Sequence, residues 1–235
     1  MNREKVFRIL TSIWFLFSIA IVALIIILLI ELVLNDIPEK FEKGSEIGNI
    51  VYKLCLAYIS SFIFYFLVVH LKKVKDRHIL EPYISGKVRT IIHSGKILIR
   101  FLVKATETKI DGQYPTQIEL EQMCLKIDPN SFVDGFHETN WLQLFEFYQQ
   151  KSESAINSVY EKIPFIDSKL VRYLGDIQNN PHYYSASNRP KKIGNKNLEQ
   201  FSKHLSQYLS LIKELEIFAE KKLIGYKPLK IDYYK

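Results

Sequence analysis

Residues 9–30 read ILTSIWFLFSIAIVALIIILLI, and residues 54–71 read LCLAYISSFIFYFLVVHL. The first run has 22 residues without a charged side chain, and the second has 18. At a rise of about 1.5 Å per residue, the first run as a helix spans about 33 Å, enough to cross the ~30 Å hydrocarbon core of a bilayer. The second run reaches a similar length when residues 50–53 are added, because the stem of Lys53 can lie along the helix with its ammonium group at the interface. The pattern predicts a chain that crosses a membrane twice and carries a large soluble C-terminal part.

The charges that flank the two runs predict the orientation. Basic residues outnumber acidic residues before the first run and after the second, whereas the segment between them is mostly acidic. Cytoplasmic flanks carry the Lys/Arg excess, so both termini are predicted to lie in the cytoplasm. The predicted organisation is a cytoplasmic N-terminus (1–8), a first transmembrane helix (9–34), an extracytoplasmic loop (35–49), a second transmembrane helix (50–71) and a cytoplasmic domain (72–235).

A cleaved signal peptide is the alternative interpretation of residues 1–34. The first run is longer than a usual h-region of ~7–15 residues, and the segment from Asn35 to Pro38 offers no small-residue cleavage site. We therefore interpret the first run as a membrane anchor.

The net charge of +7, from 32 basic and 25 acidic residues, is concentrated just after the second run. Residues 72–104 contain nine basic and two acidic side chains, so they account for the whole imbalance. We interpret this excess as the positive-inside signal continuing along a solvated helix face. The alternative is adhesion to anionic lipid head groups, which only the first few of these residues can reach.

The remainder of the chain has the spacing of amphipathic helices, with apolar residues recurring every three or four positions. Glu81-Pro82 predicts a break, after which one helix carries Ile84, Val88, Ile91, Gly95, Leu98 and Leu102 on one face. Thr116 and Glu119 have the spacing of a capping box, and Asp167 is placed to cap a later helix. The clearest helix carries Leu198, Phe201, Leu205, Tyr208, Ile212, Leu215 and Ala219. The predicted fold is all-α: a two-helix transmembrane hairpin followed by a cytoplasmic antiparallel helical bundle.

Motifs of catalysis and metal binding are absent from the sequence. No two of the six histidines have the i, i+4 spacing of a helical metal site, and no glycine-rich phosphate loop or G-x-S-x-G elbow occurs. Cys55 and Cys124 suit two unpaired thiols in a reducing cytoplasm. The sequence therefore predicts no catalytic, cofactor-binding or metal-binding residue and no enzymatic activity.

Weakly polar side chains form a stripe in the second run. Tyr58, Ser61 and Tyr65 are spaced i, i+3, i+7, which places them within roughly 60° of one another on a helix. The stripe either packs against the first run or forms a polar contact, or pore lining, between several copies of the chain, because weakly polar residues commonly join transmembrane helices. Glu31 is flanked by apolar residues, but it lies near the outer end of its run, where it can reach the interface.

A second candidate site lies in the polar segment 179–197, which is predicted to be a loop. Four cations, with two tyrosines nearby, form a patch that would suit RNA, DNA or an acidic protein partner. The alternative is a merely solvated loop, since a charge cluster alone says little about specificity. The four residues are Arg189, Lys191, Lys192 and Lys196.

The segment LAYISSFIFYFLVVHL at residues 56–71 resembles the second span of a loosely defined group of bacterial two-pass membrane proteins. In that group an aromatic-rich span leads through a basic linker into a cytoplasmic helical bundle, and some members resemble the membrane effectors of anti-phage systems, including those paired with retrons. The likeness is most specific over residues 50–100 and only architectural elsewhere. It implies that the cytoplasmic domain senses a partner and that the spans damage or depolarise the membrane; it carries over no catalytic residue.

Two functions of different class follow. In the first, the protein is an effector in anti-phage defence: a cytoplasmic protein or ribonucleoprotein partner rearranges the bundle, and the spans of several copies assemble and permeabilise the inner membrane. Two spans cannot enclose a wide conduit, so this function requires homo-oligomers in the lipid bilayer. In the second, the protein is an anchored adaptor that holds a protein or nucleic-acid partner at the membrane.

Overall fold

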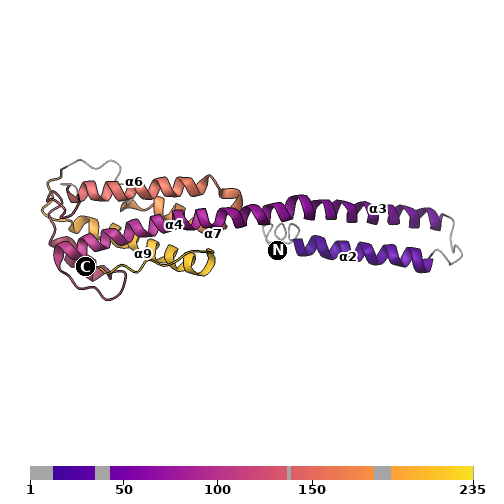
Figure 1. Cartoon of the computed structure of the whole chain (residues 1–235), viewed down its shortest axis with the longest axis horizontal. Helices are drawn as coiled ribbons and strands as arrows, with labels where there is room; N and C mark the ends of the chain where they lie inside the picture. The colour runs from indigo at the N-terminus through magenta and orange to yellow at the C-terminus, as the bar shows by residue number, and fades with distance from the viewer. Residues whose placement is uncertain (1–12, 35–42, 137–138, 183–191, 235) are drawn as a thin grey trace. The chain divides into compact units, whose positions relative to one another are not determined.

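The computed structural model describes residues 13–34, 43–136, 139–182 and 192–234, and over these residues the chain is helical (Figure 1). Within the described residues no strand forms, and the only β-type pairing is an isolated antiparallel bridge between Phe132 and Asn140. The all-α class predicted from the sequence is confirmed. The chain divides into two compact units, an N-terminal unit (residues 1–75) and a C-terminal unit (residues 76–235).

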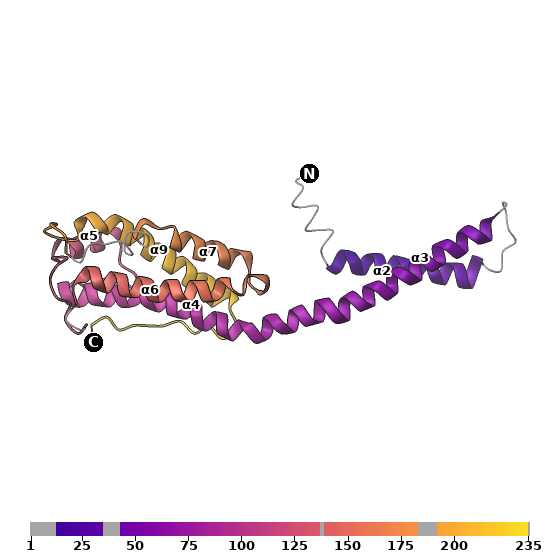
Figure 2. The ribbon, with the colours of Figure 1, turned by 90° about the horizontal axis from the view of Figure 1, so that it is seen from above.

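The N-terminal unit contains two long apolar helices that lie side by side in both views (Figures 1 and 2). Helix α2 (Ile13–Leu29) ends in a π-helical turn, Ile30–Leu34. Helix α3 (Gly44–Phe64) also continues into a π-helical turn, Tyr65–His70. Both stretches are long and apolar enough to cross a membrane. Helix α3 begins six residues earlier than the predicted second span, whereas residues 9–12 and 35–42 of the predicted spans and loop lie outside the described residues.

The helices of the C-terminal unit surround one hydrophobic core. They are α4 (Leu71–Thr106), α5 (Gln117–Leu125), α6 (Trp141–Tyr160), a 3-10 turn (Ile163–Phe165), α7 (Ser168–Gln178) and α9 (Glu199–Lys222). Every apolar position predicted for the face of the first helix, from Ile84 to Leu102, is buried. The largest fully buried side chains are Trp141 and Tyr208, and they belong to α6 and α9. Burial of these faces, at about 25 cal/mol per Å² of apolar surface, is the main force that holds the unit together.

Side chains fix the starts of three helices. Thr116 and Glu119 form the predicted capping box of α5, and Asn140 forms a second capping box at the start of α6 with Gln143. The Asp167 carboxylate accepts a hydrogen bond of 2.8 Å from the backbone N–H of Lys169, as predicted for the cap of α7. These contacts satisfy backbone donors that have no partner inside the helix.

The predicted break at Glu81-Pro82 is wrong, because α4 continues through Pro82 without interruption. A proline inside a helix has no N–H for the carbonyl four residues earlier, here that of His78, and this costs about 3 kcal/mol. Pro82 and His78 are both exposed, so water can reach this carbonyl. Leu80 and Ile84, on either side of the proline, pack on the core and keep the helix continuous.

Helix α4 packs closely against α9 at Gly95. A Cβ atom built on this glycine would lie 3.1 Å from both Cγ1 and Cγ2 of Ile212. Helices pack at short distance where a small residue of one faces a large residue of the other. The crossing places the side chain of Lys96, the next residue in α4, beside α9.

Candidate functional site

The N-terminal unit exposes most of its large apolar side chains. Among its described residues the only buried hydrophobic side chain is Ala23, on α2. Exposed side chains occur on both helices and include Phe17, Val22, Leu28, Leu54, Phe64 and Leu67. Exposed apolar surface of this extent has a large free-energy cost in water, so it marks a surface that contacts lipid or other protein.

The predicted stripe of weakly polar residues divides between two environments. The Tyr58 hydroxyl donates a hydrogen bond of 2.9 Å to the backbone carbonyl of Leu16 on α2. Tyr65 is half-buried, whereas Ser61 is exposed. Aromatic rings also join the helices, with the centroids of Phe17 and Phe62 6.1 Å apart. Tyr58 therefore links α2 and α3 within one chain, and only Ser61 is fully available to a second copy.

Each of the two apolar helices ends in a π-helical turn, and each turn holds a polar residue that the sequence singled out. Glu31 lies in the turn after α2 and is exposed, and Tyr65 opens the turn after α3. In the second turn the Phe66 ring stacks on His70 with a centroid distance of 5.6 Å. Turns of this kind within α-helices are frequent at functional sites.

Two of the four basic residues of the predicted loop lie within the described residues. Lys192 and Lys196 are exposed, whereas Arg189 and Lys191 lie outside the described residues. The side-chain amide of Asn130 holds this part of the chain through two hydrogen bonds to the backbone of Ile193, of 2.8 and 3.0 Å. The two described lysines thus stand on a segment that is fixed to the C-terminal unit, with their ammonium groups available to solvent.

A buried charged centre lies between α4 and α9, and sequence analysis missed it. We define it as Lys96, Tyr114, Glu216 and Tyr226. The Lys96 ammonium donates to a Glu216 carboxylate oxygen over 2.6 Å, and the two side chains are only 3% and 8% exposed. The other carboxylate oxygen accepts from the Tyr114 hydroxyl at 2.7 Å. Lys96 belongs to the basic excess that was interpreted as a solvated helix face, and that interpretation is wrong for this residue. Lys96 and Glu216 each have apolar neighbours three and four residues away on their helices, and this signal was present in the sequence.

Electrostatics keeps the two tyrosines of the centre protonated. Burial raises the pKa of the Tyr114 hydroxyl well above its usual range, and the hydrogen bond to the Glu216 carboxylate adds to the shift. Burial and the same carboxylate also raise the pKa of Tyr226. Both groups are therefore fixed as hydrogen-bond donors to Glu216 rather than as acids or nucleophiles.

The C-terminal segment, residues 223–234, lies in extended form on the unit and is attached to the charged centre. Lys96 donates its second hydrogen bond, of 2.6 Å, to the backbone carbonyl of Leu229. Further along, the Gln113 side-chain amide exchanges two hydrogen bonds with the backbone of Ile231, at 3.2 and 3.3 Å. The Tyr233 hydroxyl donates to the Gln113 carbonyl at 2.7 Å. The segment is thus an extended chain bound by side chains, and it pairs with no strand among the described residues.

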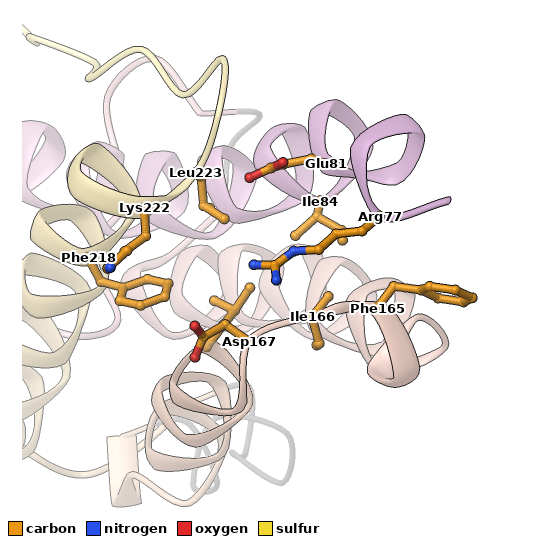
Figure 3. Close-up of a pocket in the computed structure, with 10 residues that line it drawn as sticks. Arg77, Glu81, Ile84, Phe165, Ile166, Asp167, Phe218, Lys222 and Leu223 are labelled. Atoms are coloured by element: carbon orange, nitrogen blue, oxygen red, sulfur yellow. The ribbon is translucent and has the colours of Figure 1, made fainter. Parts of the chain in front are cut away.

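A small pocket lies where the C-terminal segment leaves α9 (Figure 3). Its volume is about 40 Å³, room for little more than one water molecule. Figure 3 shows the Arg77 guanidinium group extending into the pocket, toward Phe218 and Asp167. Glu81 fixes the start of the segment by accepting a hydrogen bond of 3.3 Å from the backbone N–H of Ile224. The pocket is a packing feature too small for an organic ligand.

Among the described residues no group of three or more His, Cys, Asp or Glu side chains could hold a metal ion. Compared with known protein families, curated proteins and solved structures, the chain matches none.

Proposed function

We propose that the protein is a membrane effector. In this proposal α2 and α3 form a transmembrane hairpin in the bacterial inner membrane, and the C-terminal unit is a cytoplasmic helical bundle that a partner controls. Assembly of several hairpins then permeabilises the membrane, as in anti-phage defence. One observation supports the membrane location: most large apolar side chains of α2 and α3 are exposed, whereas the C-terminal unit buries most of its own.

The hairpin supports assembly because each helix covers only part of the other's apolar surface. Tyr58 contacts α2, but most large apolar residues of both helices face outward. In a membrane, association between such surfaces relies on packing and on hydrogen bonds of modest strength. A single hairpin encloses no conduit, so permeabilisation requires several copies.

Control by a partner is supported by the form of the C-terminal unit. Its extended C-terminal segment is attached by side-chain hydrogen bonds around Lys96 and Gln113 and by the buried ring of Tyr233, rather than by a helix or sheet. Segments of this kind can detach at lower free energy than the core helices, which makes them suitable elements for a rearrangement.

The topology is tested first. A reporter fused after Lys235 or before Met1 should report the cytoplasm, and one inserted near Gly44 should report the outside. The reverse pattern would refute the orientation and, with it, a cytoplasmic C-terminal unit.

The effector activity is tested in cells that contain a membrane-potential dye. Induction of the chain should depolarise the inner membrane, and replacing both spans by an unrelated pair of transmembrane helices should abolish the effect. An adaptor would keep its function after this replacement and would leave the potential unchanged throughout. Full viability and an unchanged potential on activation would reject the effector proposal.

The stripe is tested with the triple variant Tyr58→Phe, Ser61→Ala, Tyr65→Phe, which removes three hydroxyl groups and keeps most of the volume. Loss of the Tyr58 hydrogen bond should cost about 0.6 kcal/mol, too little to prevent formation of the hairpin. A pore-lining role predicts normal insertion with loss of depolarisation. Normal insertion with full depolarisation would leave these residues in a packing role only.

A further inference from the structure

An open groove lies on the C-terminal unit between α4, α6 and the C-terminal segment. Helices α4 and α6 run side by side in both views (Figures 1 and 2). The groove has a volume of about 290 Å³ and is lined by Gly86, Arg89, Thr90, His93, Lys151 and Leu229. Three of these six residues are basic, and none is acidic. This groove is separate from the charged centre and from the predicted basic loop.

The basic side chains of the groove have no acidic partner among the described residues. Neither Arg89 nor Lys151 takes part in any of the ion pairs there, and the Lys151 ammonium group lies over the ring of Tyr148, 6.0 Å from its centroid. Their charges are felt at His93: burial lowers the pKa of its imidazole, and the charges of Lys151, Arg89 and Lys96 lower it further. The groove therefore has a positive potential with no fixed counter-charge.

His93 also has an unused hydrogen-bonding atom. Its Nδ1 is buried and has no partner within hydrogen-bond distance. Buried polar atoms in proteins are nearly always paired, so the unpaired Nδ1 indicates that no protein group fixes the orientation of this ring. A ring nitrogen that faces the groove can donate to an anion, in the matching tautomer or as an imidazolium ion.

The other residues that line the groove carry no negative charge that would repel an anion. The Leu229 carbonyl oxygen, which would repel a negative charge, already accepts the hydrogen bond from Lys96. Gly86 has no side chain, and nothing lies within 4 Å of the position of a Cβ atom there. The Thr90 hydroxyl donates to the Gly86 carbonyl at 3.1 Å and is not free to donate to a ligand in this arrangement. The donors available to an anion are thus Arg89, His93 and Lys151.

We propose that this groove binds a small phosphate-bearing anion. Three basic donors from two helices match an anion that carries more than one negative charge and several acceptor oxygens, whereas a carboxylate needs only one arginine. The volume is just below the usual range for drug-sized ligands, which suits a phosphate or pyrophosphate group rather than a nucleic-acid strand. The phosphate belongs either to a soluble compound or to a lipid head group.

The test is calorimetric titration of pyrophosphate into the full chain in a nonionic detergent. The variant Arg89→Gln/Lys151→Gln should raise the Kd at least tenfold. Its matched control is Lys87→Gln/Lys203→Gln, which removes the same charge outside the groove and should change the Kd less than twofold. Both substituted groove residues are exposed, so folding should be retained, and Arg89→Lys/Lys151→Arg should preserve most of the binding.

A second readout reports on the groove itself. Bound pyrophosphate should raise the pKa of His93, measured from its ring proton resonance. Absence of binding at millimolar pyrophosphate, or equal weakening by both double variants, would overturn the proposal. Competition by dihexanoyl phosphatidylglycerol would identify a lipid head group as the source of the phosphate, and its absence would identify a soluble compound; either result follows binding and supports the site.

Discussion

We expect that replacing Glu216 by alanine destabilises the C-terminal unit more than replacing any other charged residue. The change leaves the Lys96 ammonium, which is 3% exposed, with the Leu229 carbonyl as its remaining partner. It also removes the acceptor for Tyr114. Removing one member of a buried ion pair costs about 3–5 kcal/mol, because the other charge stays buried without compensation. Glu216→Gln keeps the volume and one acceptor oxygen, so we expect a loss of about 1.5–3 kcal/mol, the range for a hydrogen bond to a charged group.

The assay is urea unfolding of the full chain in detergent, followed by the fluorescence of Trp141 after Trp14→Phe removes the other tryptophan. Trp141 is 2% exposed and reports on the core of the C-terminal unit. The double variant Lys96→Met/Glu216→Ala should cost less than the sum of its two single variants, because it removes both charges together. The control is Asp134→Ala, which breaks an exposed ion pair and should leave the unfolding midpoint unchanged. A cost below about 1 kcal/mol for Glu216→Ala, or strict additivity in the double variant, would refute a coupled buried pair.

Four further predictions concern the same unit. Gly86→Ala should raise the free energy of unfolding by about 0.5–1 kcal/mol, because nothing lies within 4 Å of the new Cβ atom. Gly95→Ala should lower the free energy of unfolding by about 1–3 kcal/mol, because its Cβ atom would lie 3.1 Å from Ile212 of α9. If the two glycine variants changed the free energy of unfolding equally, the packing of α4 on α9 would be contradicted. Burial raises the pKa of the Cys124 thiol to about 12, so in a Cys55→Ser background the folded chain should resist iodoacetamide at pH 8 and react only in urea, as measured by mass spectrometry. Burial lowers the pKa of His93, so as the pH falls the unfolded chain binds a proton at this residue before the folded chain does, and stability should fall below about pH 6.5. Urea unfolding at pH 7 and pH 5 should show a smaller loss of stability for His93→Gln than for the natural chain. An equal loss would count against the lowered pKa.

The helices were largely predictable because their signals are local. Apolar spacing located the buried face of α4, and the Thr116 and Asp167 caps follow from one side chain beside a helix start. Pro82 misled the sequence analysis because the rule for proline is also local. Core contacts of Leu80 and Ile84 on both sides of it maintain the helix, and these contacts depend on segments far away in sequence.

The charged centre and the groove could be predicted only in part. The apolar neighbours of Lys96 and Glu216 indicate that both are buried, but 120 residues separate the two, and no local pattern pairs them. The groove has even less signal, since it joins Arg89 and His93 to Lys151 on another helix. Within the predicted membrane stripe, Tyr58 and Tyr65 are half-buried and Ser61 is exposed, a division that the spacing alone did not predict.

Release of a trapped dye from vesicles tests the effector proposal most directly. The purified full chain is reconstituted into vesicles of bacterial lipid at increasing protein-to-lipid ratios, beside a chain whose two spans are replaced by unrelated transmembrane helices. Assembly of several hairpins predicts release that rises more steeply than linearly with the amount of the natural chain and is absent for the replaced one. No release at any ratio, or equal release by both chains, would contradict a membrane-permeabilising function for α2 and α3.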